Sequence, residues 1–542
     1  MSTSEVSTQS IDHLGLVAGM IEQLDMKACI ETELPTKSDQ KILTHADAIS
    51  AMILNGLGFA NRRLYLAPQF FEKKAVNLLL GKDITSEQIN DDTLGRTLDA
   101  IYAYGASELY EKIALRAMQQ LNIVPQTYHL DSTSFHVDGQ YNSEEEKKEG
   151  VVHIVQGYSR DHHPELNQVV LNLIVEHQSG IPMLMRSADG NQSDKTAFGD
   201  IIDKHIGSLK AVAENPLFIA DAALYTKENL SIITKQEIDF ISRVPLVIKE
   251  AKIFQSQGSA LEFTAIDDNY SYAQQVVEYA GMKQQWVLYR STHATAREIR
   301  TAERKIDKER TKEEKLYGKL SRQAFFCEED ALKASEDFQK SLKWHQMHDT
   351  TIVTKDKFGT KGRPPEGAVP EAIHYFITAD LIPKKQKMDQ AADDQSGYFI
   401  LATNRLEMSP EMLLREYKSQ QRVERGFRFL KSPEFLASAI FLKKPERIEA
   451  LLMIMTLCLM VYAGLEYTIR KELKEQDKTF PNQLGKPVQN PTTRWIFECF
   501  MEIQIIMITQ LNQNIIANLK DRNIMLLDLL GERYWQFYRN RN

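Results

Sequence analysis

The order of apolar patterns between residues 127 and 245 constrains the fold of this 542-residue chain more than any other feature. A strand-like alternation over TYHLD precedes two apolar runs, Gln168–Val175 and Ile181–Met185, which a four-residue turn separates. A helical stretch (SDKTAFGDIIDKHI), a short apolar run (NPLFIAD), a second helical stretch (KENLSIITKQE) and another strand (IDFISRVP) follow. A continuous apolar run such as LFIA is typical of a strand buried on both faces. The order therefore predicts an α/β layer with a mixed sheet.

The remaining sequence predicts further regions on both sides of this layer. Residues 1–125 show helical spacing of apolar residues, and the turn near Asn90 allows either a helix-turn-helix with Arg96 on its second helix or an ordinary helical pair. Residues 245–395 predict an insertion, because the strand SGYFILATN resumes the earlier pattern after them. We expect the catalytic core to comprise 126–244 and 396–447, and residues 448–542 to form a helical C-terminal region with a role in dimerisation.

Composition excludes several classes of protein. The four cysteines form no CxxC pair, which argues against a zinc ribbon or a disulfide scaffold and favours a reducing compartment. The opening MSTSEVSTQSIDH lacks the pattern of a signal peptide. The longest apolar run, Ala450–Leu465, is shorter than the roughly 20 residues of a membrane-spanning helix. We therefore expect a cytoplasmic protein in which this run is a buried core helix.

Charge is unevenly distributed along the chain. The net charge is −8, yet Tyr417–Arg447 holds eight basic residues against three acids, and Arg297–Arg322 holds ten against six. A local basic segment can bind nucleic acid even when the whole chain is acidic.

Three acids differ from the others in their context. Asp131 is predicted at the end of the strand YHLD, Asp221 ends the buried run LFIAD, and Glu424 lies within the first basic segment on a predicted helix. Each acid alone is more often a turn, cap or solvated helix residue. Two strand-end aspartates and a glutamate from a packing helix can, however, converge on one point. Hard oxygen ligands of this kind suit Mg²⁺ or Mn²⁺, and two such ions stabilise in-line displacement at phosphorus.

The spacing around Glu424 supports this interpretation. Tyr417, Glu424 and Lys431 are seven residues apart, so a continuous helix would place them on one face, with Gln420 on the same side. A phenol, an amide, a carboxylate and an ammonium group on one face would suit a phosphodiester beside metal ions, held without reading its sequence.

These residues resemble the DDE transposases of bacterial insertion sequences, in the superfamily (insertion sequence 4 type) with a Tyr-x2-Arg-x3-Glu-x6-Lys signature. In YKSQQRVERGFRFLK, Tyr417, Glu424 and Lys431 match this signature, Gln420 replaces its arginine, and Arg422 lies on another side of the helix. The segments LDSTSF, GYSRDHHPEL, GNQSDK and FIADAALYTKENL are also similar to that superfamily, and its insertion sequence 1634 branch is the most similar.

The resemblance implies a ribonuclease-H-like core, interrupted by an insertion, that cleaves DNA at the element ends and transfers the freed strand to target DNA. It implies two Mg²⁺ ions, for which Mn²⁺ can substitute, held by Asp131, Asp221 and Glu424. The implied partners are double-stranded DNA (the terminal inverted repeats and the target) and a second copy of the chain, with no membrane and no small-molecule cofactor. The protein would be bacterial and associated with the nucleoid when bound. The implied phosphate-contacting residues are Tyr417, Gln420, Arg422, Arg428 and Lys431.

Other candidate residues have simpler interpretations. The histidines near Asp131 lack the spacing of zinc ligands, and Ser132–Ser134 form no nucleophile elbow. Lys361 and Arg363 belong to a GRP-containing loop, which is either a minor-groove contact or a plain basic loop. Trp286 and Trp344 could stack on an unpaired base, although core packing is the more frequent role.

Two other functions are compatible with the same residues. A nuclease that hydrolyses DNA without joining strands would use the same core chemistry, and a non-catalytic DNA-binding relative would keep the acids for structure. A strand-transfer assay separates the first alternative from a transposase, and metal-dependent nicking separates the second.

Overall fold

The strand β2 (Thr127–His136) is the centre of the mixed sheet that the sequence predicts. It pairs antiparallel with β3 (Gln168–Glu176), which pairs antiparallel with β4 (Pro182–Ala188). On its other side β2 pairs in parallel with β5 (Leu217–Ala220), and β5 pairs in parallel with β6 (Asp239–Arg243). The order β4-β3-β2-β5-β6, with helices after β4 and β5, is that of a ribonuclease-H-like fold and confirms the predicted fold class.

This computed structural model describes residues 6–36, 43–59, 66–81, 83–137, 150–158, 163–210, 215–359, 368–393, 397–432, 442–508 and 513–540. The chain divides into two compact units. The first unit comprises Met1–Arg243, Val276–Gln285 and Ala402–Asn542, and the second comprises Val244–Gln275 and Trp286–Leu401.

Burial explains why the core sequence folds as it does. All nine residues of β3 and all four residues of β5 are buried, as expected for strands covered on both faces. The predicted helices are α8 (Asp194–Lys210) and α9 (Lys227–Lys235), and the Thr226 side chain caps α9 by accepting a hydrogen bond from the Asn229 backbone N–H. The hairpin β3–β4 and both helices therefore confirm the sequence prediction.

The N-terminal region is mainly helical, as predicted. Its helices in the described residues are α1 (Leu14–Gln23), α2 (Met26–Glu33), α3 (His45–Leu57), α4 (Ala67–Phe71), α5 (Val76–Leu79), α6 (Asp91–Tyr104) and α7 (Ala106–Leu121). Both interpretations of the turn near Asn90, a helix-turn-helix and an ordinary helical pair, were wrong, because Ser86–Gln88 forms only a single 3₁₀ turn before α6.

The C-terminal region contains more strand than its helical prediction allowed. Its elements are α16 (Pro445–Glu475), β13 (Phe480–Pro481), β14 (Pro487–Val488), α17 (Thr493–Cys499), β15 (Gln504–Ile508), β16 (Gln513–Ala517), α18 (Asp521–Leu530) and α19 (Glu532–Trp535). The strand β15 pairs with β16 and also with β1 (Val6–Ser10), which the helical prediction for residues 1–125 omitted. The isoleucine-rich sequence QIIMI is a strand signal, since β-branched residues favour strands.

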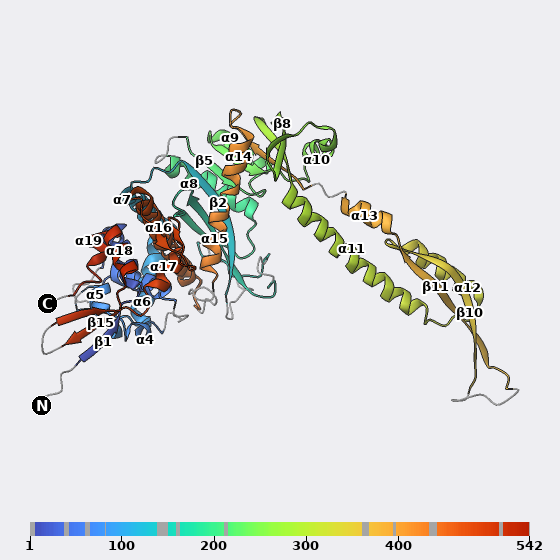
Figure 1. The fold of residues 1–542 in the computed structure, drawn as a ribbon, viewed down its shortest axis with the longest axis horizontal. Helices are drawn as coiled ribbons and strands as arrows, with labels where there is room; N and C mark the ends of the chain where they lie inside the picture. The colour runs from blue at the N-terminus through green and yellow to red at the C-terminus, as the bar shows by residue number, and fades with distance from the viewer. Residues whose placement is uncertain are drawn as a thin grey trace. The chain divides into compact units, whose positions relative to one another are not determined.

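Helix α16 forms the core around which both ends of the chain pack. It contacts α1, α3, α6 and α7 from the N-terminal region and α17 and α18 from the C-terminal region, and Figure 1 shows blue and red helices side by side around it. By length and composition α16 could cross a membrane, but 89% of its most apolar window is buried inside the protein. This burial confirms the prediction of a core helix over Ala450–Leu465.

The second unit contains most of four strands in the order β12-β9-β8-β7, and a separate two-stranded ribbon. Its strands and helices are α10 (Lys249–Ser256), β7 (Thr264–Asp267), β8 (Tyr270–Tyr279), β9 (Met282–Ser291), α11 (Thr292–Leu320), α12 (Glu328–Ser341), β10 (His345–Lys357), β11 (Ala372–Pro383), α13 (Lys385–Asp393) and β12 (Tyr398–Thr403). The ribbon β10–β11 packs against α12 through a small core of Phe325, Ala331 and Ile377.

Candidate active site

The sheet register places Asp131 and Asp221 next to one another. The parallel pairing of β2 with β5 ends at Leu130 opposite Ala220; Asp131 is the next residue within β2, and Asp221 directly follows the end of β5. Neighbouring strands lie about 4.8 Å apart, so the two carboxylates project from adjacent positions. One expectation was wrong in detail: Asp131 is not at the end of β2, which continues to His136 through its antiparallel pairing with β3.

Local hydrogen bonds orient both aspartates, which are half-buried. The backbone N–H of Ser132 donates to Asp131 Oδ1 at 2.8 Å, and the backbone N–H of Ala223 donates to Asp221 Oδ1 at 2.9 Å. The Ser242 hydroxyl on β6 donates to the Asp221 carbonyl at 2.7 Å. These bonds fix the carboxylates where the parallel pairing ends.

The helix that was predicted over Tyr417–Lys431 is two helices, and this prediction was wrong. The first is α14 (Pro410–Lys418) and the second is α15 (Gln421–Leu430), while Lys431 follows the end of α15. At the junction, the Ser419 hydroxyl donates to the Glu416 carbonyl at 2.5 Å, and the Gln420 backbone N–H donates to the Tyr417 carbonyl at 3.2 Å. A side chain that bonds the preceding turn competes with the regular helix, which explains the tightened junction.

Helix α15, which carries Glu424, packs on β2, the strand of Asp131. Its C-terminal end is fixed by Lys431, whose ammonium lies 5.9 Å from the centre of the Phe135 ring on β2. Phe135 is four residues beyond Asp131, so both project from the same face of β2 at a separation of about 13 Å. Glu424 precedes Lys431 by seven residues, which is about 10 Å along a helix. Glu424 is exposed on this helix.

The pKa of the Tyr417 phenol responds to the charges of all three acids. Its burial raises the pKa of Tyr417, and the charge of Arg243 lowers it. The carboxylates of Asp221, Glu424 and Asp131 each raise the same pKa, because a phenolate is disfavoured near negative charge. The acids from β2, β5 and α15 are therefore all close enough to act electrostatically on one group.

Arg243 is the residue of this site that the sequence prediction missed. It is exposed at the end of β6, the strand that runs parallel to β5. The reasoning that selected Asp221 at the end of β5 applies equally to Arg243 at the neighbouring strand end.

The donor chemistry of the site suits a divalent cation, since three carboxylates are hard oxygen ligands. Among the described residues, however, no three histidine, cysteine, aspartate or glutamate side chains lie close enough together to hold one ion. The structure thus places Asp131 and Asp221 where the parallel pairing of β2 and β5 ends, without assembling the three acids around a single ion position.

The other predicted site residues differ in their exposure to solvent, and some of them lie outside the described residues. Gln420 is half-buried at the start of α15, and Arg428 is exposed near its end. The Arg422 side chain, Lys361 and Arg363 lie outside the described part of the chain. Trp286 and Trp344 are 0% and 5% exposed, which confirms core packing and excludes them as exposed stacking platforms.

Comparison with known proteins gives two family matches. A family described as "Domain of unknown function (DUF4277)" matches residues 6–115, and the family "Transposase DDE domain" matches residues 124–461. No curated protein matches the chain. A solved structure of the piggyBac transposase synaptic complex with hairpin DNA is similar at 9% identity and a TM-score of 0.37, over 86% of this chain and 79% of that chain. Because the second family match spans more than half of the sequence and includes Asp131, Asp221 and Glu424, the chain belongs to the Transposase DDE domain family.

Proposed function

We propose that this protein is a cut-and-paste transposase that cleaves DNA at the ends of its own element and joins them to target DNA. The observation that carries the proposal is the pairing of β2 with β5, which puts Asp131 and Asp221 at adjacent positions within a transposase DDE domain, with α15, the helix of Glu424, packed on β2. In the first step water attacks a phosphodiester, the P–O3′ bond breaks, and a 3′-hydroxyl is freed. In the second step this hydroxyl attacks a target phosphodiester and displaces another 3′-oxygen.

The acids would act as ligands of two Mg²⁺ ions, with Mn²⁺ as a substitute. When bound, such ions stabilise the attacking and leaving oxygens of an in-line displacement. Asp131 and Asp221 already project from adjacent strands, and Glu424 would complete the set from α15. Because the described acids are not gathered around one ion position, we expect binding of metal and DNA to draw them closer.

Residues around the acids would hold the DNA backbone without reading its sequence. The proposed phosphate contacts are Tyr417, Gln420, Arg422, Arg428 and Lys431, with Lys361 and Arg363 as further candidates. Arg243 joins this set, because its positive charge already acts on Tyr417. We also propose a homodimer on DNA, with residues 1–125 binding element ends, in a cytoplasmic enzyme of the insertion sequence 4 type nearest to the 1634 branch.

The proposed site is tested by replacing each acid with its amide. Asp131→Asn, Asp221→Asn and Glu424→Gln keep the side-chain shape and remove one ligand charge, so each should abolish metal-dependent cleavage of DNA carrying the native element ends. DNA affinity should stay within about threefold of the unmodified protein, because phosphate contacts supply most of it.

Asp239→Asn is a matched control, since Asp239 lies on the same sheet and pairs with Arg405 instead. If one of the three amide variants still cleaves DNA, the acid replaced in that variant is not part of the catalytic site. A strand-transfer assay with supercoiled target DNA then separates a transposase from a nuclease that only hydrolyses.

A further inference from the structure

Helix α11 carries basic residues along one face. They follow one another at intervals of three or four positions, which is the spacing of a single stripe on an α-helix. The basic stripe consists of Arg297, Arg300, Arg304, Lys308, Lys312, Lys315, Lys319 and, just after the helix end, Arg322. All eight residues are exposed. From Arg297 to Lys319 the stripe is about 33 Å long, at 1.5 Å per residue.

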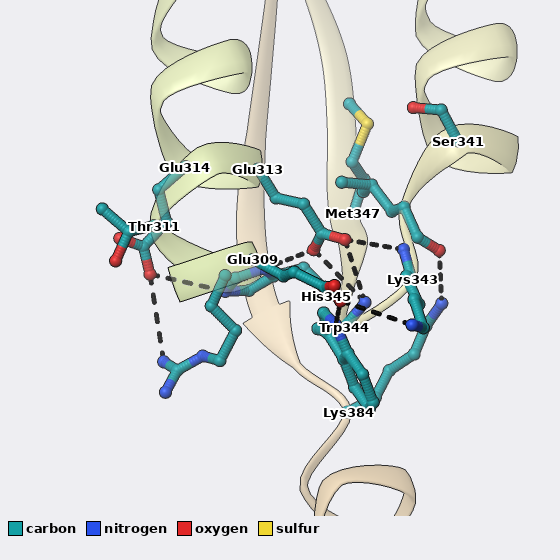
Figure 2. Close-up of polar contacts among 12 residues, drawn as sticks. Glu309, Thr311, Glu313, Glu314, Ser341, Lys343, Trp344, His345, Met347 and Lys384 are labelled. Carbon is teal, nitrogen blue, oxygen red and sulfur yellow. Dashed lines mark hydrogen bonds and ion pairs between the residues drawn. The ribbon is translucent and has the colours of Figure 1, made fainter. Parts of the chain in front are cut away.

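Two acids of α11, Glu309 and Glu313, lie on the other side of the helix, where they hold the second unit together. Figure 2 shows Glu309 and Glu313 pointing toward Trp344 and His345 at the start of β10. Glu309 Oε2 accepts from Trp344 Nε1 at 2.6 Å, and Glu313 Oε2 lies 2.8 Å from His345 Nδ1. Hydrogen bonds from Trp344 and Lys343 hold the pKa of Glu309 below its ordinary value.

Three other acids of α11, Glu298, Asp307 and Glu314, also have partners. Glu298 accepts a hydrogen bond from the Gly397 backbone N–H at 3.0 Å. Arg310, which is not part of the stripe, pairs with Asp307 at 3.3 Å and with Glu314 at 3.9 Å. Within the described part of the chain, no member of the basic stripe forms an ion pair of this kind.

Packing fixes the orientation of the helix. Ile306 is buried, and the Tyr317 hydroxyl donates to the Ala379 carbonyl at 2.5 Å and accepts from the Ala379 backbone N–H at 2.7 Å. These residues lie on the side of α11 opposite the basic stripe, so the stripe faces away from the packed interior. Its like charges four positions apart, such as Arg304 and Lys308, destabilise the helix unless an anion binds them.

We infer that the basic stripe of α11 binds the phosphate backbone of double-stranded DNA over about one helical turn, without reading its sequence. This inference rests on the proposed function, which supplies DNA as the substrate. Charge complementarity favours it: the stripe presents eight cationic side chains along one helix and just past its end, and its length is close to the 34–36 Å of one duplex turn. A membrane surface does not suit it, because an interfacial helix needs a continuous apolar face, whereas Ile306 is buried and Leu316 is the one large hydrophobic residue exposed among the described residues of α11.

The test measures the affinity of the full chain for a 40-base-pair duplex of random sequence as salt concentration is varied. In the stripe variant, R304Q/K308Q/K312Q/K315Q, the slope of log affinity against log salt should become shallower by about 0.9 for each phosphate that the protein no longer neutralises. Affinity at low salt should fall by about tenfold or more. A matched control, K249Q/K252Q/K333Q/K385Q, removes the same charge from exposed lysines of the same unit and should change both quantities much less.

A charge-conserving variant and a second polyanion test the inference further. The charge-conserving variant R304K/K308R/K312R/K315R should bind like the unmodified protein; a loss equal to that of the stripe variant would overturn the inference. Equal slopes for the stripe and control variants would also overturn it, while the amide variants of the three acids test the proposed function separately. If the stripe variant loses binding to labelled poly-glutamate but not to the duplex, the partner is an acidic protein and the inference is wrong.

Discussion

Lys431 combines an apolar contact with a charge near the candidate site. Its ammonium lies 5.9 Å from the centre of the Phe135 ring, and the side chain is half-buried. A lysine can pack its methylene stem on an aromatic ring while its charged end stays near solvent. The same residue can therefore fix the end of α15 on β2 and contact a DNA phosphate.

Replacing Lys431 separates these two roles. Lys431→Ala should weaken binding to element ends and make the slope of log affinity against log salt shallower by about 0.9, because the protein then neutralises one phosphate fewer. Lys431→Met keeps the packing on Phe135 and should give the same change in slope with less loss of stability. Salt titrations by fluorescence anisotropy measure the slope for both variants, and chemical denaturation measures their stability. Lys443→Ala removes an exposed charge nearby as a control, and an unchanged slope in both Lys431 variants would exclude the phosphate contact.

At the scale of elements, the junction between α14 and α15 is held by side chains from β2 and from the turn after β3. The Ser419 hydroxyl lies 3.2 Å from His129 Nε2 and 3.1 Å from His177 Nδ1, and these two nitrogens are 3.0 Å apart. His129 is buried and precedes Asp131 by two residues. The junction that separates Tyr417 from Glu424 is thus attached to the strand that carries the first acid.

Removing the Ser419 hydroxyl should loosen this attachment. We expect Ser419→Ala to lower the free energy of unfolding by about 1 kcal/mol, the usual value of one buried hydrogen bond. We also expect it to slow cleavage more than it weakens DNA binding, because Glu424 would be held less firmly relative to Asp131.

Single-turnover cleavage and DNA affinity, measured side by side, check this expectation. Ser419→Thr keeps the hydroxyl and should restore the rate. Ser432→Ala, at a half-buried serine just after α15, is the control for the loss of a hydroxyl. Equal losses of binding and cleavage in Ser419→Ala would contradict a positioning role.

At the scale of the whole chain, segments from its two ends fold as one body within the first unit. β1 pairs with β15, and α1 packs on α16 and α19. Gly19 on α1 allows this approach, because a Cβ there would lie only 2.5 Å from an atom of the Tyr534 ring. His13 lies in the same interface, with its ring stacked 4.3 Å from Phe497 and Nε2 2.7 Å from the Leu57 carbonyl.

The stability of this body should decrease in mild acid. Burial lowers the pKa of His13 to about 4 from its ordinary 6.5, so the unfolded chain binds a proton at a higher pH than the folded chain. The stability that neutral, buried His13 contributes is fully present above about pH 6.5 and is lost as the pH falls toward 4. Between pH 7 and pH 5 the loss should be about 2 kcal/mol.

Chemical denaturation at pH 7, 6 and 5 measures this loss. His13→Gln cannot titrate in this range, so its stability should depend less on pH by the same amount. Identical pH dependence of the two proteins would show that His13 does not carry the effect.

The sequence by itself determined the local elements and the identity of the candidate acids. Apolar periodicity depends only on neighbouring residues, so the β3–β4 hairpin, α8, β5, α9 and the core helix α16 could be predicted from it. The carboxylates of Asp131, Asp221 and Glu424 were selected by residue type and local context, together with the resemblance to transposases.

Only the tertiary structure decided features that depend on contacts between distant segments. The contacts of Ser419 with His129 and His177 join residues more than 240 positions apart in the chain, and β1 forms because β15 supplies its partner nearly 500 positions later. The extension of β2 beyond Asp131 needs the antiparallel pairing with β3. Likewise, Arg243 joins the site only because β6 lies next to β5. Such contacts leave no local periodicity, since the interacting residues are neighbours in space and not in sequence.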